Sequence, residues 1–292
     1  MDPLERLVVG ADDSAASSAA VGWACRYLKA DGVLHVVHAF TPVAELALAA
    51  LQVDWVPLRD QARNDLEGPW TEPARASNRT FKTHLVDDDP ADALMHTAQR
   101  FDASAIVVGA HGPALANRHV LGSVTKKLLH HAKVPVVVVH PDAAEVESAG
   151  PIVACVGYGK AGDATAHWAA SVAAASGRPL TLLHALSNRP FYPKDSPLES
   201  LSSHLGPDVA VEWVQDNLDR LVAEIKALFP DVVVTTKIAK GSATDAIMNA
   251  GAQAELLVLG NGISAIIGPR TQHVLTHGAF ATAVVPTCET SR

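Results

Sequence analysis

Hydrophobic and polar positions alternate in a regular way along the whole chain. Short, continuous apolar runs are separated by amphipathic stretches of helical length, which is typical of a parallel sheet covered on both faces by crossover helices. Strands are predicted near 6–11, 33–39, 80–86, 104–109, 135–140, 151–157, 179–185, 231–238, 255–260 and 282–285. Helices of the first half are predicted near 15–30, 55–70, 91–101 and 123–132. The pattern indicates a doubly wound α/β fold.

The second half of the chain repeats the first. Trp23 matches Trp168 and His38 matches His184, and the register between the halves is nearly constant. The segment 142–150, rich in Ala, Glu and Ser, joins two predicted strands and is too short for a further helix. We therefore predict two domains, 1–142 and 150–292, each with its own five-stranded parallel sheet.

Two long polar stretches stand at equivalent places before the third strand of each half. They cover 71–80 and 187–206. We expect surface loops or loosely held helices there.

Charge and composition restrict the partners and the compartment. The chain of 292 residues has 23 basic against 31 acidic side chains, a net charge of -8, so no general basic field favours nucleic acid or an anionic membrane. Its three cysteines are scattered, which fits ordinary intracellular thiols. The N-terminal residues do not resemble a signal peptide, and no apolar run is long enough to span a membrane. A cytoplasmic protein is expected.

The first candidate site follows the first strand. In open parallel sheets, ligands bind beyond the carboxyl ends of the strands, where the strand order reverses. Asp12 stands at such an end, where its carboxylate could accept a hydrogen bond from a ribose hydroxyl or a purine amino group. The alternative is that Asp12, with Asp13 and Ser14, simply caps the first helix.

A second candidate site follows the fourth strand. The sequence Gly109-Ala110-His111-Gly112 is followed by nine residues and then by Gly122-Ser123, which opens a helix. Glycines let a phosphate approach the backbone, and a helix N-terminus offers unpaired N–H groups and a positive dipole end. As alternatives, Ser123 could be an N-cap, and Lys126 and Lys127 a solvated helix face.

Several catalytic and metal-binding classes lack their motifs. The chain has neither a Gly-x-Ser-x-Gly elbow nor a Walker A sequence, and no His, Cys, Asp or Glu cluster has zinc-site spacing. His111 is the best candidate for a general base, although orienting a phosphate is the simpler role. The sequence assigns no catalytic residue.

The motif Gly109-x2-Gly112-x9-Gly122-Ser123, with a Val-rich strand on either side of its helix, resembles the nucleotide-binding signature of the universal stress protein family. The resemblance extends over both halves. It implies a Rossmann-like α/β/α sandwich with strand order 3-2-1-4-5, and ATP or AMP bound with Mg or Mn on the phosphates. By motif match, the adenine and ribose would contact Ala11, Asp12 and Ala39, and the ribose and phosphates would contact Gly109, His111, Gly112, Gly122, Ser123 and Val124.

One departure from the family pattern is the run Asp87-Asp88-Asp89, because the family commonly has Gly where Asp88 stands. Three carboxylates close to a polyphosphate would repel it. We expect them either to point to solvent or to hold a cation.

The second half diverges at the ligand positions. Gly157 stands where the first half has Asp12, and Pro269 replaces Ser123 after a shorter loop. A mainly structural second domain is therefore predicted. A second ATP site, or a different anion site at Gly157-Tyr158-Gly159-Lys160, is the less favoured alternative.

The leading functional hypothesis is an ATP-binding regulator of the stress response. A slow ATPase, an adenylate-forming enzyme of a related fold, and an interaction protein that has lost nucleotide stay open. The fifth strands of the two halves, at 135–139 and 282–285, would each leave an apolar edge. We predict that these edges pair as an intramolecular pseudo-dimer, and a further homodimer is left open.

Overall fold

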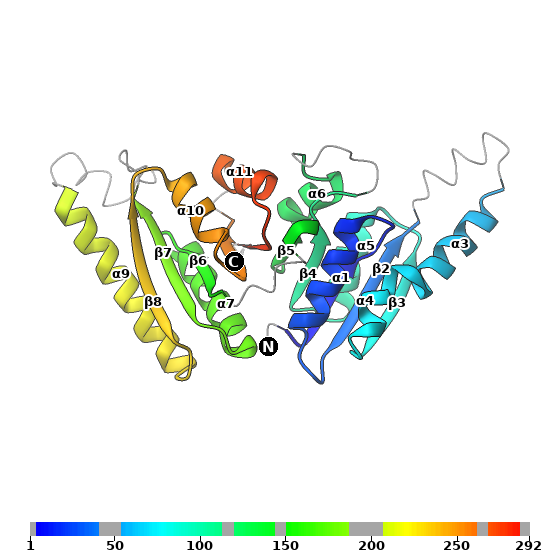
Figure 1. The fold of residues 1–292 in the computed structure, drawn as a ribbon, viewed down its shortest axis with the longest axis horizontal. Coiled ribbons are helices and arrows are strands. Elements are labelled where there is room, and N and C mark those ends of the chain that lie inside the picture. The colour runs from blue at the N-terminus through cyan, green and yellow to red at the C-terminus, as the bar shows by residue number, and fades with distance from the viewer. Residues whose placement is uncertain are drawn as a thin grey trace, which may run out of the picture.

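The computed structural model describes residues 4–40, 54–112, 120–143, 150–186, 207–261 and 268–286. Two α/β units share one ten-stranded sheet of order β3-β2-β1-β4-β5-β10-β9-β6-β7-β8 (Figure 1). The first unit contains β1 (Arg6–Gly10), β2 (Val33–Ala39), β3 (Phe81–Val86), β4 (Ala105–Gly109) and β5 (Val136–Val139). The second contains β6 (Ile152–Cys155), β7 (Leu180–Leu186), β8 (Val234–Lys240), β9 (Leu256–Gly260) and β10 (Thr282–Val285). Each unit has the expected order 3-2-1-4-5, so the predicted fold is confirmed.

Helices cover both faces of the sheet. One face carries α1 (Ala15–Tyr27), α3 (Val56–Glu67), α4 (Glu72–Ala76), α7 (Lys160–Ser176) and α9 (Pro207–Leu228). The other carries α5 (Pro90–Arg100), α6 (Ser123–His131), α10 (Ala243–Gly251) and α11 (Pro269–His277). Because helices cover both faces, the central strands can be apolar throughout, as in β1, where Leu7, Val8 and Val9 are fully buried.

The segment 71–80 differs from its predicted character. A 3-10 turn (Pro69–Thr71) leads directly into α4, and both Thr71 and Ala74 are fully buried. The Thr71 hydroxyl donates to the Leu66 carbonyl at 3.1 Å, which ties this turn to the end of α3. The expectation of a surface loop or a loosely held helix was therefore wrong here. The matching stretch, 187–206, lies outside the described residues.

The two units meet through β5 and β10, which pair antiparallel, whereas the other strand pairs of the sheet are parallel. Val136 is opposite Val284, Val137 opposite Ala283, and Val138 opposite Thr282. The predicted pairing of the fifth strands is confirmed. The 3-10 turn (Pro141–Ala143) follows β5, and residues 144–149 of the connection lie outside the described residues.

Two side-chain hydrogen bonds, one donated by each half, reinforce this junction. The ring N–H at Nε2 of His140 donates to the Leu275 carbonyl at 3.0 Å, and Asn261 Nδ2 donates to the Leu129 carbonyl at 3.1 Å. Leu129 and Leu275 occupy matching positions near the ends of α6 and α11, so each half satisfies a helix-end carbonyl of the other. Burial lowers the pKa of His140, which favours the neutral ring at neutral pH.

Candidate nucleotide site

A pocket opens at the carboxyl ends of β1 and β4, where the strand order of the first unit reverses. Its cavity is about 270 Å³. The structure brings together every residue that the sequence assigned to a site in this half: Ala11, Asp12, Ala39, Gly109, His111, Gly112, Gly122, Ser123 and Val124. The rest of the lining comprises Gly10, Ser14, Ser17, Val37, His38, Pro90, Leu94, Val108 and Thr125.

Asp12 is held in a defined turn between β1 and α1. Its Oδ1 accepts a hydrogen bond from the Ser14 N–H at 2.9 Å, and its own N–H donates to Ser17 Oγ at 2.9 Å. The N-cap of α1 is Ser14, whose hydroxyl oxygen accepts from the Ser17 N–H at 3.0 Å. Asp12 itself is therefore not the helix cap. A Cβ at Gly112 would lie 3.4 Å from Asp12 Oδ2, so this second carboxylate oxygen faces the glycine loop.

The first turn of α6 forms another wall of the pocket. Gly122 is the N-cap, its N–H donates to the Ala110 carbonyl at 3.0 Å, and no side chain caps the helix. Ser123 is exposed at the first helical position, so the N-cap interpretation of Ser123 was wrong. The N–H groups of Ser123, Val124 and Thr125 have no intrahelical acceptor and carry the positive end of the helix dipole. This turn is suited to an anion.

Glycine is needed at the two ends of the motif for different physical reasons. At Gly122, a Cβ would find His111 Cα at 3.5 Å and Gly112 N at 3.7 Å, so one methyl fits but a branched side chain would fill the gap. At Gly109, a Cβ would lie 2.8 Å from the Cβ of Ala16, because α1 packs tightly against the end of β4. The glycine requirement at position 109 is thus set by helix packing and not by a ligand.

His38 is a pocket residue that the sequence analysis used only to align the repeats. Its Nδ1–H donates to the Ala11 carbonyl at 2.8 Å, and its ring centroid lies 4.6 Å from that of Trp70. When the ring is neutral, this donation leaves Nε2 as an acceptor. The signal that could have found it is the histidine at the matching position of the second half, His184.

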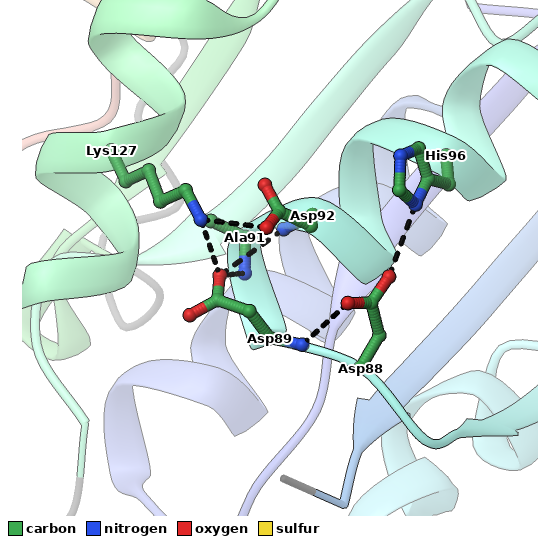
Figure 2. A network of polar contacts seen from close by, with 6 residues as sticks. All are labelled: Asp88, Asp89, Ala91, Asp92, His96 and Lys127. Atoms are coloured by element: carbon green, nitrogen blue, oxygen red, sulfur yellow. Dashed lines mark hydrogen bonds and ion pairs between the residues drawn. The ribbon is translucent and has the colours of Figure 1, made fainter. Parts of the chain in front are cut away.

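The carboxylates of the acidic run beside the pocket contact other groups of the protein. Asp87 pairs with Arg59 at 2.6 Å, and Asp88 Oδ2 lies 3.0 Å from His96 Nδ1 (Figure 2). Asp89 is the N-cap of α5, and none of the three carboxylates lines the cavity. Each of the three carboxylates therefore interacts with a protein group beside the pocket.

Lys127 completes this network from the helix face that the sequence indicated as solvated, and its side chain is 38% exposed. Figure 2 shows its ammonium between two carboxylates, 3.0 Å from Asp89 Oδ1 and 2.7 Å from Asp92 Oδ2. Partial burial would raise the pKa of Asp89, but hydrogen bonds from Lys127 and from the N–H groups of Asp92 and Ala91 outweigh it and lower the pKa. The bridge connects α6 to the start of α5, and both helices contribute to the pocket.

The matching region of the second half lacks the same donors and acceptors. Gly157 provides no carboxylate, and the space where its Cβ would lie has no atom within 4 Å. Pro269 begins α11 after the N-cap Gly268 and has no N–H to offer an anion. Residues 262–267 of this loop lie outside the described residues.

Across the described ranges, no three His, Cys, Asp or Glu side chains gather in a way that could hold a metal ion. Burial raises the pKa of Cys155 to about 12, and it also raises the pKa of Cys25, so both thiols are protonated and unreactive at neutral pH. The described helices include none with the length and apolar character needed to cross a bilayer.

Comparison with known proteins agrees with the repeat. The family model described as the universal stress protein family matches residues 3–140 and again 149–286. A universal stress protein of Mycolicibacterium smegmatis is 27% identical over 263 residues, which cover 87% of this chain and 86% of that protein. One from Mycobacterium tuberculosis is 25% identical over 272 residues, with the same shares covered.

Solved structures with the same fold extend over nearly the whole chain. A universal stress protein from Archaeoglobus fulgidus superposes with a TM-score of 0.64 at 17% identity, covering 97% of each chain. A putative universal stress protein from Pseudomonas aeruginosa gives a TM-score of 0.59 at 17% identity, covering 97% of this chain and 93% of the other. At this identity, the likeness concerns the fold alone.

Proposed function

The chain belongs to the universal stress protein family, and on that premise we propose that its first half binds an adenine nucleotide, ATP or AMP, and acts as a nucleotide-dependent regulator of a stress response. The second half serves mainly as a structural partner. The site is the pocket between the Asp12 turn and the first turn of α6.

One observation carries this proposal: a single pocket contains both a carboxylate and an unpaired helix N-terminus. A nucleotide has complementary groups, because its ribose hydroxyls donate hydrogen bonds and its phosphates accept them. Between these groups, Ala11, Val37 and Ala39 provide a small apolar surface for the base. Nucleotides bind at this edge of the sheet in doubly wound folds generally.

Mg or Mn would bind together with ATP and would be coordinated mainly by its phosphate oxygens. Asp87, Asp88 and Asp89 each contact a protein group and lie outside the described lining of the pocket, so we expect phosphate oxygens to be the main ligands of such an ion. Such an ion would neutralise phosphate charge beside a pocket whose described lining contains no Lys or Arg.

Binding is favoured over catalysis. A general base needs a partner that orients it, and His111 Nδ1 is buried with no hydrogen-bond partner among the described residues. The pocket therefore offers a place to hold a nucleotide and no evident group to activate a water molecule. A slow ATPase is the alternative that a turnover measurement would detect.

The test is calorimetric titration of the full chain with ATP and Mg. We expect saturation near one equivalent per chain, because the second half lacks the matching carboxylate and helix-start N–H. Gly122→Val should abolish binding while circular dichroism and melting stay close to wild type, since the side chain would fill the gap beside His111 and Gly112.

The matched control is Gly268→Val at the equivalent position of the second half, where a Cβ would meet no atom within 4 Å. This variant should bind ATP as wild type does. Two equal sites per chain, or normal binding by Gly122→Val, would contradict the proposal. Analysis of the supernatant after heat denaturation separates the alternatives further: bound ATP or AMP supports a binding protein, and rapid conversion of added ATP supports an enzyme.

A further inference from the structure

A second pocket lies at the amino ends of the strands, opposite the nucleotide pocket. The C-terminal ends of α1 and α7 approach each other there (Figure 1). Its cavity is about 310 Å³, within the size range of small-ligand sites. Residues 26–30 and Arg79 line it from the first half, and Ala175, Ser176 and Arg178 line it from the second. It is separate from the nucleotide pocket and needs both halves to be complete.

The lining of this inter-half pocket is strongly basic. Of the nine described residues that line it, four are Arg26, Lys29, Arg79 and Arg178, and none of the nine is acidic. The chain as a whole has more acidic than basic side chains and a net charge of -8. The concentration of positive charge in one cavity therefore runs against the overall composition.

Neighbouring groups compensate only part of this charge. Glu255 is 3% exposed, accepts a hydrogen bond from the Tyr27 hydroxyl and lies 3.7 Å from Arg26 Nη1. The ends of α1 and α7 contribute a negative charge of roughly one half each. Arg79 and Arg178, both half-buried, have no carboxylate within ion-pair distance in the described part of the chain.

We propose that the inter-half pocket binds a small multivalent oxyanion of the polyphosphate type, held by Arg79 from the first half and Arg178 from the second. A guanidinium group presents a planar set of donors that matches phosphate oxygens in a bidentate arrangement. Two guanidinium groups that line one cavity can together bind an anion with more than one phosphate group. Because its ligands come from both halves, this anion links the two domains at the amino ends of the strands, on the side of the sheet opposite the nucleotide pocket.

The probe is sodium tripolyphosphate, added to the full chain at constant ionic strength, with the melting temperature as the readout. A ligand that binds only the folded state raises this temperature in a concentration-dependent way. We expect such a rise for wild type, at least about tenfold weaker binding for Arg79→Gln or Arg178→Gln, and loss of the effect in the double variant.

Two controls make the result specific to this pocket. Lys237→Gln removes the same charge from an exposed position on the edge strand β8 and should keep the wild-type response. Gly122→Val blocks the nucleotide pocket and any phosphate bound there, and it should keep the part of the rise that depends on Arg79 and Arg178, so failure of the nucleotide proposal does not affect this one. Absence of a rise in wild type, a full rise in the double variant, or loss of the rise in Gly122→Val would each overturn the proposal.

Discussion

Val137 and Ala283 lie directly opposite each other in the antiparallel pair that joins the two halves. They also occupy the same position of the repeated sequence, so the approximate two-fold axis between the halves passes between them. The neighbouring pairs obey the same relation, because Val136 faces Val284 and Val138 faces Thr282. Each half thus contributes the same strand, in the same register, to the junction.

The first prediction concerns Val137→Lys. Val137 is fully buried, so a lysine there places an unpaired charge in the centre of the sheet, and we expect a loss of about 3 kcal/mol or more in the free energy of unfolding. Both halves should be destabilised together in urea unfolding followed by circular dichroism. Val233→Lys is the control, because Val233 is 66% exposed, and it should change stability by less than about 0.5 kcal/mol. Equal effects of the two variants would argue against the shared junction.

The second prediction separates the two motif glycines. Gly109→Ala should destabilise the protein by about 1–3 kcal/mol, because the new methyl would lie 2.8 Å from Ala16 Cβ and force α1 away from β4. Gly122→Ala should be close to neutral or slightly stabilising, since its nearest contact would be 3.5 Å. Urea unfolding of both variants measures the difference. Similar stabilities would show that α1 can move to admit the methyl.

Much of this architecture could be predicted from sequence because its signals are local or repeated. Continuous apolar runs marked the strands, and the internal repeat predicted the pairing of the fifth strands. The strand of the second half predicted at 231–238 is instead β8 (Val234–Lys240), because its start is set by pairing of Val234 with Leu180. Strand ends depend on a partner that is distant in sequence.

The third prediction concerns Asp12→Asn. The amide oxygen of asparagine can still accept from the Ser14 N–H and keep the turn, while the second carboxylate oxygen is lost as an acceptor. We expect ATP binding about tenfold weaker with the melting temperature unchanged, because one hydrogen bond to a charged group contributes about 1.5–3 kcal/mol. Calorimetry and thermal unfolding give the two values. Wild-type affinity would mean that Asp12 acts only in the turn.

The fourth prediction concerns the cap of α5. Asp89 accepts hydrogen bonds from the N–H groups of Ala91 and Asp92, at 3.0 Å and 3.3 Å. Asp89→Ala removes the cap and should reduce stability by about 1 kcal/mol, whereas Asp89→Asn retains the cap and should lose less. Urea unfolding at low and high salt distinguishes the cap from the Lys127 ion pair, since only the ion pair is screened by salt. If both variants lose the same amount, the charge matters more than the cap.

The fifth prediction concerns pH. His35 Nδ1 lies 2.9 Å from His84 Nε2, and burial, His84 and the nearby cations of Lys82 and Arg6 lower the pKa of His35 to about 4 from its ordinary 6.5. The unfolded chain binds more protons than the folded chain between these values. Stability should therefore be fully present above about pH 6.5 and fall as the pH drops toward 4, by at most about 1.4 kcal/mol per pH unit for this histidine.

Urea midpoints measured between pH 7 and pH 4 test this expectation. The double variant His35→Leu/His84→Leu should show a smaller decline, with a residual slope because the pKa values of His140 and His184 are also lowered by burial. His96→Gln, at an exposed site, should decline as wild type does. An undiminished decline in the double variant would exclude the histidine pair as its origin.

What sequence could not supply is the pairing of polar groups that are distant along the chain. The acidic run near the pocket could only be recognised as a conflict, because the contact of Asp87 with Arg59 depends on how α3 packs. The same is true of Tyr27 and Glu255, which meet only once the two halves are assembled. The nine residues assigned from the sequence line one pocket, but the sequence could not reveal that Ala16 is what requires a glycine at position 109.

The pairing of Val137 with Ala283 has a consequence for how the two halves can change over evolution. In a dimer of identical chains, a residue on the two-fold axis faces its own copy, so every mutation there occurs twice and must be compatible with itself. Once both copies are encoded in one chain, that restriction ends, and a large side chain can be matched by a small one, as valine is by alanine here. The same freedom allows one half to carry a carboxylate, Asp12, where the other carries Gly157.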